Sequence, residues 1–162
     1  SFAGPMKEIL SKLMGIPLET FEDPKAKEAP FATPIILDAR LIRKILKAME
    51  DMLSPYGELD YHTTISLTGI ENVQLLSPRH ALQFIGTELI RKKIHPDWHV
   101  AAAFRKEAMA KLDKNGLYCV TDARFPNEFM WLKNKYKSNF VGFYVERPEA
   151  EELLAAATHE SE

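Results

Sequence analysis

The segment Tyr118–Glu128, with the sequence YCVTDARFPNE, constrains the fold more than any other part of the chain. The apolar run 117–120 is rich in residues that favour β-strands, and it stops abruptly at Thr121 and Asp122. An arginine, Arg124, follows two residues later. Open α/β sheets bind ligands where loops follow the carboxyl ends of their strands. The segment therefore predicts a buried strand at 117–121 and a functional site at its end.

The rest of the chain predicts mostly helices. Apolar periodicity and end signals indicate helices over 5–14, 38–53, 77–94, 96–114 and 127–137. A second strand is predicted at 139–145, the stretch 17–34 resembles a loop, and 58–76 alternates like a strand or hairpin. The helix–strand–helix–strand order at the end favours an α/β fold, with a parallel sheet flanked by helices.

Length and charge narrow the classes of function. A chain of 162 residues suffices for one domain with a sizeable core. The net charge of -2 gives no overall basic field, so nucleic acid is an unlikely partner, although RKKIH at 91–95 is a local basic cluster. The single cysteine, Cys119, suits a reducing compartment such as the cytoplasm. No apolar run reaches the roughly 18 residues that a membrane span needs.

Asp122 and Arg124 are the strongest candidate pair. A carboxylate at a strand end can hold a magnesium ion or its water, and a guanidinium presents a planar fork of donors to a phosphate. The structural alternative is an ion pair, or an aspartate that caps a turn. Glu128 can orient Arg124 or cap the helix that follows.

Other cationic side chains are candidate phosphate ligands. Lys7 follows Pro5 on the first predicted helix, and Arg79 lies at the start of the third, where the helix dipole favours anions. Arg91 lies further along that helix, beyond Gly86, which costs about 1 kcal/mol relative to alanine and indicates close approach by a ligand or another backbone. The alternative for each cation is a solvated surface residue.

Histidine and tryptophan near residue 98 allow two further interpretations. His95 and His99 have the i, i+4 spacing of metal ligands, but Pro96 is expected to begin the helix between them, so metal binding is not favoured. Trp98 either stacks on a base or, more commonly, packs in a core.

Several blocks of the sequence, in order and approximate spacing, resemble the phage-type deoxynucleoside monophosphate kinases of the P-loop NTPase superfamily. The resemblance covers most of the chain outside 17–76. The blocks are FAGPMKE at 2–8, SPRHALQFIGTELIRK at 77–92, Trp98, VTDARFPNE at 120–128, VERP at 145–148 and THESE at 158–162.

The resemblance implies one nucleotide-kinase-like domain over 1–162. Its parallel sheet would be flanked by helices, with a helical region for the monophosphate, a variable insertion at 17–76 and a lid at 146–162. The implied reaction is phosphorylation of a deoxynucleoside monophosphate to the diphosphate, with ATP and Mg²⁺. Such transfer relies on positioning and charge neutralisation.

The resemblance also assigns roles. Asp122 and Arg124 would be catalytic, with Asp122 near the metal or the acceptor phosphate. The cations around the phosphates would be Lys7, Arg79, Arg91 and Arg124. The nucleoside site would be shaped by Thr87, Glu88 and Trp98, and Glu128 would join the substrate-binding residues. The lid would contain Arg147, His159, Glu160, Ser161 and Glu162.

One departure from the family is large. The 162 residues contain no G-x-x-x-x-G-K-[ST] phosphate loop, and the family's first strand, loop and helix and its last strand and helix have no counterpart. We therefore expect a kinase domain that is incomplete at both ends, as a part of a longer protein would be. The alternative is a non-catalytic nucleotide-binding or interaction module. A homodimer through an exposed helix face stays open, and so does the base that is accepted.

Overall fold

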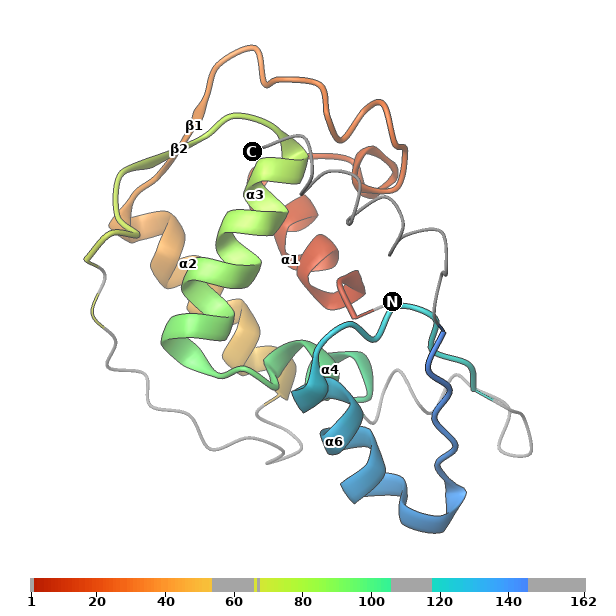
Figure 1. The fold of residues 1–162 in the computed structure, drawn as a ribbon. Coiled ribbons are helices and arrows are strands. Elements are labelled where there is room, and N and C mark those ends of the chain that lie inside the picture. The colour runs from red at the N-terminus through yellow and green to blue at the C-terminus, as the bar shows by residue number, and fades with distance from the viewer. Residues whose placement is uncertain (1, 54–65, 67, 106–117, 146–162) are drawn as a thin grey trace, which may run out of the picture.

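The computed structural model describes residues 2–53, 66, 68–105 and 118–145 (Figure 1). Four α-helices lie in the first 103 residues: α1 (Gly4–Met14), α2 (Ala39–Leu53), α3 (Pro78–Phe84) and α4 (Trp98–Ala103). The stretch η3 (Ile85–Ile94) continues α3 as a π-helix, and α6 (Pro126–Tyr136) comes later. Short 3₁₀ turns form η1 (Leu18–Phe21) and η4 (Lys137–Asn139).

Local signals begin and end these helices where the sequence predicts. Pro5 occupies the first turn of α1, and Gly15 ends it in the left-handed conformation at φ 66°. The Asp38 carboxylate accepts the Leu41 N–H at 2.7 Å and so caps α2. Ser77 accepts the His80 N–H at 3.1 Å before α3. The predicted helices at 5–14, 38–53, 77–94 and 127–137 are confirmed.

The predicted helix at 96–114 is shorter in its described part. It ends at Ala103, and Phe104 and Arg105 are not helical. The Arg105 guanidinium donates to the Ala102 carbonyl at 2.8 Å, which satisfies an acceptor at the helix end. Residues 106–114 lie outside the described residues.

The one sheet among the described residues is antiparallel. The strand β1 (Ile35–Leu37) pairs with β2 (Val73–Leu75), with Ile36 opposite Gln74. The strand β2 falls within the alternating stretch 58–76, whereas no element was predicted at β1. Most of 58–67 lies outside the described residues.

The described parts of the two predicted strands, 118–121 and 140–145, have no strand pairing. A strand forms only against a neighbouring strand, and neither segment has one among the described residues. The described residues therefore show no strand at either place, and the two strands stay predictions. The parallel α/β sheet of a P-loop-kinase-like fold stays a prediction.

The core lies among the first four helices. Because α1 contacts α2, α3 and α4, it is central to this packing (Figure 1). Side chains with no exposed surface fill the space between these elements, among them Leu10, Ile42, Ile45, Ile85, Leu89, Ile90 and Trp98. A smaller cluster of Phe2, Val100, Phe104 and Leu132 fixes α6 against α4 and the start of α1. This second cluster positions the segment that carries Asp122 and Arg124.

Candidate functional site

A pocket of about 300 Å³ lies beside the 118–124 segment. Its polar lining includes Thr121, Asp122 and Arg124, and its apolar lining includes Phe2 and Tyr118. The sequence singled out Asp122 and Arg124, and the structure brings both to this pocket. The aromatic walls were not predicted, since Phe2 is distant in sequence.

The Asp122 carboxylate is anchored at one oxygen. The Phe2 backbone N–H donates to Oδ2 at 3.0 Å, just before α1 begins. The other oxygen makes no hydrogen bond with a described residue. A carboxylate held at one oxygen keeps the second for a cation or a substrate hydrogen. Asp122 thus combines a structural contact with a position in the pocket.

Arg124 combines a fixed backbone with an open side chain. Its N–H donates to Glu128 Oε2 at 3.0 Å, and the Phe125 N–H donates to the same oxygen at 3.2 Å. The Arg124 guanidinium is exposed and makes no hydrogen bond or ion pair with any described residue. The backbone of Arg124 is therefore held while its cationic group remains available to an anion.

Glu128 connects this turn to η3, the π-helix that carries Arg91. Its carboxylate is almost fully buried and accepts a hydrogen bond from the Arg91 Nη2 group at 2.5 Å. The Arg91 guanidinium also lies over the Phe125 ring, 3.9 Å from its centroid. Glu128 caps α6 and holds the Arg124 backbone, while its role in substrate binding stays a prediction. Arg91 does not line the Asp122–Arg124 pocket, and it supports the site through its ion pair with Glu128.

The other predicted cations have partners elsewhere. Lys7 forms a long ion pair with Glu22, at 3.9 Å, and the exposed Arg79 pairs with Glu28. Neither cation lines the Asp122–Arg124 pocket. The structure therefore does not bring Lys7 or Arg79 together with Arg124.

The predicted nucleoside-site residues are also separated. Thr87 is exposed on η3, and Glu88 pairs with Lys92 at 2.7 Å. Trp98 is fully buried in the core, and its indole N–H has no hydrogen-bond partner among the described residues. The predicted lid residues Arg147, His159, Ser161 and Glu162 lie outside the described residues.

The neighbour of Gly86 is a histidine ring. His99 Nε2 donates to the Gly86 carbonyl oxygen at 3.1 Å, and a Cβ atom on Gly86 would lie 3.6 Å from that ring. Burial is the main cause that lowers the pKa of His99 to about 4, and the nearby Arg91 contributes. His95 instead accepts the Asp97 N–H at 3.0 Å. The two histidine rings therefore have separate hydrogen-bond partners.

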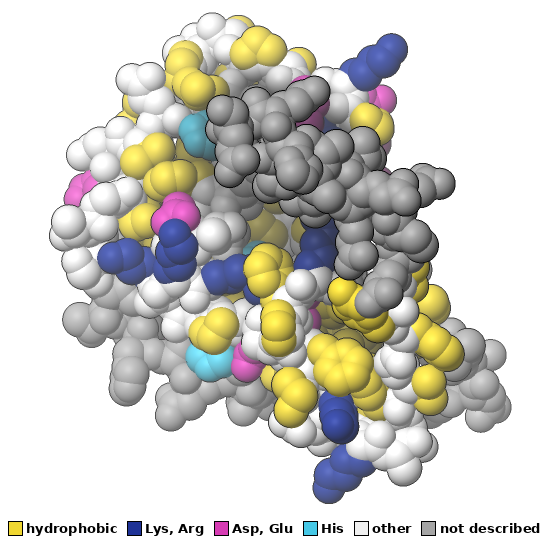
Figure 2. All heavy atoms as spheres, in the orientation of Figure 1, with side chains coloured by type: hydrophobic (Ala, Val, Ile, Leu, Met, Phe, Trp, Pro, Cys, Tyr) yellow, Lys and Arg dark blue, Asp and Glu magenta, His cyan; other side chains and the backbone are white. Residues whose placement is uncertain are grey.

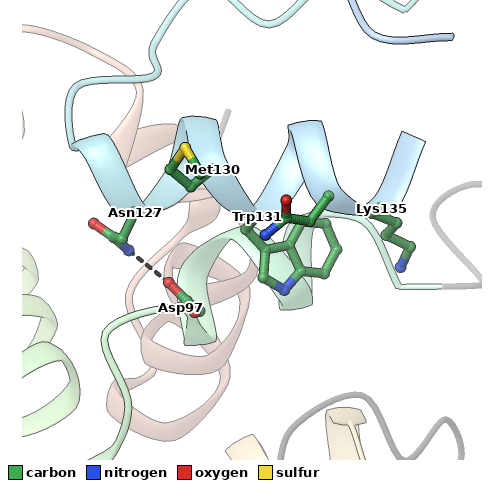
Figure 3. Close-up of a pocket in the computed structure, with 6 residues that line it drawn as sticks. Asp97, Asn127, Met130, Trp131 and Lys135 are labelled. Atoms are coloured by element: carbon green, nitrogen blue, oxygen red, sulfur yellow. Dashed lines mark hydrogen bonds between the residues drawn. The ribbon is translucent and has the colours of Figure 1, made fainter. Parts of the chain in front are cut away.

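A second, more open pocket of about 500 Å³ runs along α6 (Figure 3). The Asn127 amide donates to Asp97 Oδ1 at 2.8 Å and to the Pro96 carbonyl at 3.1 Å. Lys135 lies over the Trp131 ring, 4.5 Å from its centroid. The Asn127 contacts hold the start of α6 against the loop before α4. They stabilise the turn at 124–128, and Arg91 donates to the same Pro96 carbonyl at 3.5 Å.

The residues of the first pocket supply only part of the ligand set that a magnesium ion needs. Mg²⁺ binds oxygen ligands, commonly one or two carboxylates together with substrate phosphates. Asp122 offers one such carboxylate, which fits a metal that a nucleotide also holds. Within the described ranges, no group of three or more His, Cys, Asp or Glu side chains comes close enough to bind a metal by itself.

Comparisons with known proteins found no match to a family model, to a curated protein or to a solved structure. In the described part of the chain, no helix is both long and apolar enough to cross a lipid bilayer.

Proposed function

We propose that the protein binds a deoxynucleoside monophosphate at the Asp122–Arg124 pocket and phosphorylates it with ATP and Mg²⁺ in the cytoplasm. The open Arg124 guanidinium carries the proposal, since it lines the pocket and has no partner among the described residues. A guanidinium in this position can bind two phosphate oxygens at once. The sequence resemblance supplies the substrate class and the reaction.

The contributions of this chain to that reaction would be positioning and charge. Arg124 would neutralise the acceptor phosphate, and Asp122 would bind the metal or orient the acceptor. Mg²⁺ would bridge the phosphates of ATP and reduce their charge. Turnover also requires a phosphate loop, which the 162 residues do not contain. The kinase proposal therefore depends on a loop supplied by another segment.

The second candidate is a nucleotide-binding module without turnover. The absence of a G-x-x-x-x-G-K-[ST] motif from the sequence favours it, because the chain has no recognisable element that could cradle a triphosphate. Both candidates share the monophosphate site and differ in ATP binding.

Titration calorimetry of this chain with the four deoxynucleoside monophosphates tests the shared site. We expect at least one to bind, and Arg124→Ala to weaken its affinity at least about tenfold, since charged hydrogen bonds contribute roughly 1.5–3 kcal/mol. Arg43→Ala is the matched control, because Arg43 is exposed on α2. Unchanged affinity in Arg124→Ala would refute the site.

ATP separates the two candidates. Binding of Mg²⁺-ATP together with formation of a deoxynucleoside diphosphate would support the kinase. Monophosphate binding without ATP binding would support the non-catalytic module for these 162 residues.

A further inference from the structure

The segment after η4 exposes large apolar side chains to an unusual extent. Val141, Phe143, Tyr144 and Val145 have 72%, 86%, 88% and 83% of their surface exposed. Figure 2 shows hydrophobic side chains gathered over α6 and the chain that follows it. A contiguous exposed apolar patch of this kind usually marks an interaction site.

Two positions of the segment, Phe140 and Gly142, lie against α6. Phe140 packs against Phe129 of α6, with ring centroids 5.0 Å apart. The Phe129 ring also lies directly over Gly142, so close that a Cβ atom there would be 2.2 Å from it. The large side chains of the segment, Val141, Phe143, Tyr144 and Val145, all remain exposed. A run of β-branched and aromatic residues of this kind favours an extended strand.

The backbone of the segment also lacks partners. The Phe140 N–H donates to the Lys137 carbonyl at 3.2 Å, within η4. From 141 to 145, no backbone N–H or C=O group forms a hydrogen bond with a described residue. Unpaired backbone groups along an extended apolar run form a template for an added strand.

The charge of the side chains beside the segment indicates which kind of partner would bind. Residues 129–145 include three lysines, Lys133, Lys135 and Lys137, and no aspartate or glutamate, in a chain whose net charge is -2. Lys133 and Lys137 are exposed and form no ion pair with a described residue. The basic side chains lie at the end of α6 from which the segment starts. A partner that runs along this end meets two lysines that form no ion pair with a described residue.

We propose that residues 141–145 form a docking edge for an extended strand of another protein, apolar at alternate positions and acidic where it passes Lys133 and Lys137. The added strand would satisfy the backbone groups of 141–145 and cover Val141, Phe143 and Val145. Its acidic end would balance the lysines. This inference is independent of the nucleotide site, because none of these residues lines the Asp122–Arg124 pocket.

Three fluorescent peptides of equal length test the proposal with the full chain. Each alternates Val and Thr, and each ends in a short run of Glu, Gln or Lys. We expect the Glu peptide to bind at least about tenfold tighter than the Lys peptide at low salt, and the difference to shrink as salt is added. Hydrogen exchange should slow at 141–145 when the Glu peptide binds.

Two variants separate the apolar and the charge contributions. Phe143→Ser with Val145→Ser should abolish binding of all three peptides, and the fold should persist because both side chains are exposed. Lys133→Gln with Lys137→Gln should abolish only the preference for Glu. Lys44→Gln, at an exposed site on α2, is the charge control.

Several results would overturn the proposal. Equal affinity for the three peptides would remove the charge argument, and slowed exchange elsewhere would move the site. Tighter binding of a single-stranded oligonucleotide than of the Glu peptide would assign the patch to nucleic acid. Concentration-dependent protection of 141–145 without peptide would assign it to a second copy of the chain.

Discussion

Glu128 shows how one buried carboxylate can organise a turn. It receives the Arg91 guanidinium and the backbone N–H groups of Arg124 and Phe125. Its side chain is 2% exposed, and that of Arg91 is 17% exposed. A pair this buried offers little net gain over an apolar pair, but it is costly to break from one side. The value of the pair lies in fixing the backbone at Arg124.

Glu128→Gln should destabilise the protein by roughly 3 kcal/mol, because it leaves the Arg91 charge without its counter-charge. Urea unfolding monitored by circular dichroism measures the loss. Glu88→Gln is the control, since the ion pair of Glu88 with Lys92 is more exposed and should contribute well under about 1 kcal/mol. Equal losses in the two variants would contradict the structural role given to Glu128.

At the scale of elements, the α-helix α3 changes to the π-helix η3 beside Gly86. The π-helix begins at Ile85, and the next residue, Gly86, accepts a hydrogen bond from His99 through its carbonyl oxygen. A hydrogen bond from the His95 N–H to the Ile90 carbonyl, at 3.0 Å, shows the i→i+5 spacing at the other end. His99 therefore contacts the π-helix η3 close to the residue at which it begins.

Gly86→Ala should leave the fold intact and stabilise it by about 0.5–1 kcal/mol, because a Cβ atom there meets only ordinary contacts at 3.6 Å. Gly15→Ala is the contrasting variant. Gly15 has a φ of 66°, so alanine should destabilise α1 by about 1 kcal/mol. Thermal unfolding of both variants measures the difference. Destabilisation by Gly86→Ala would instead indicate that the glycine is required at η3.

The elements also show what the sequence could predict. Helix ends depend on neighbours in the chain, such as Ser77 before α3, so local patterns located them. Strands depend on distant partners, so the β-rich pattern at 140–145 did not establish whether a partner is present. The pairing of Arg91 with Glu128 joins residues that are 37 apart. No spacing rule reveals such a contact, so the sequence did not predict the ion pair of Arg91.

At the scale of the whole molecule, two surfaces differ in chemistry. The Asp122–Arg124 pocket combines an acid and an open cation with aromatic walls. The 141–145 edge is apolar and bordered by lysines. The cluster of Phe2, Val100, Phe104 and Leu132 connects both surfaces to the helical core of α1 to α4. A change to one surface should therefore leave the structure of the other unchanged, provided that this cluster stays packed.

The stability of the whole domain should depend on pH through His99. Burial lowers the pKa of His99 from 6.5 to about 4, although the Gly86 carbonyl and Glu128 oppose the shift. The unfolded chain therefore binds a proton as the pH falls below about 6.5, while the folded protein does so only near pH 4. The stabilisation from neutral His99 is complete above pH 6.5 and is lost as the pH falls towards 4, by at most about 3 kcal/mol.

Urea unfolding at several pH values between 7.5 and 4, compared with His99→Gln, isolates this contribution. Glutamine can still donate to the Gly86 carbonyl but does not titrate, so the variant should lose less stability on acidification than the natural protein. The carboxylates titrate in both proteins and cancel in the comparison. Parallel pH profiles would show that His99 becomes protonated without unfolding the domain, and hence that its ring is more accessible to water than the packing against Gly86 indicates.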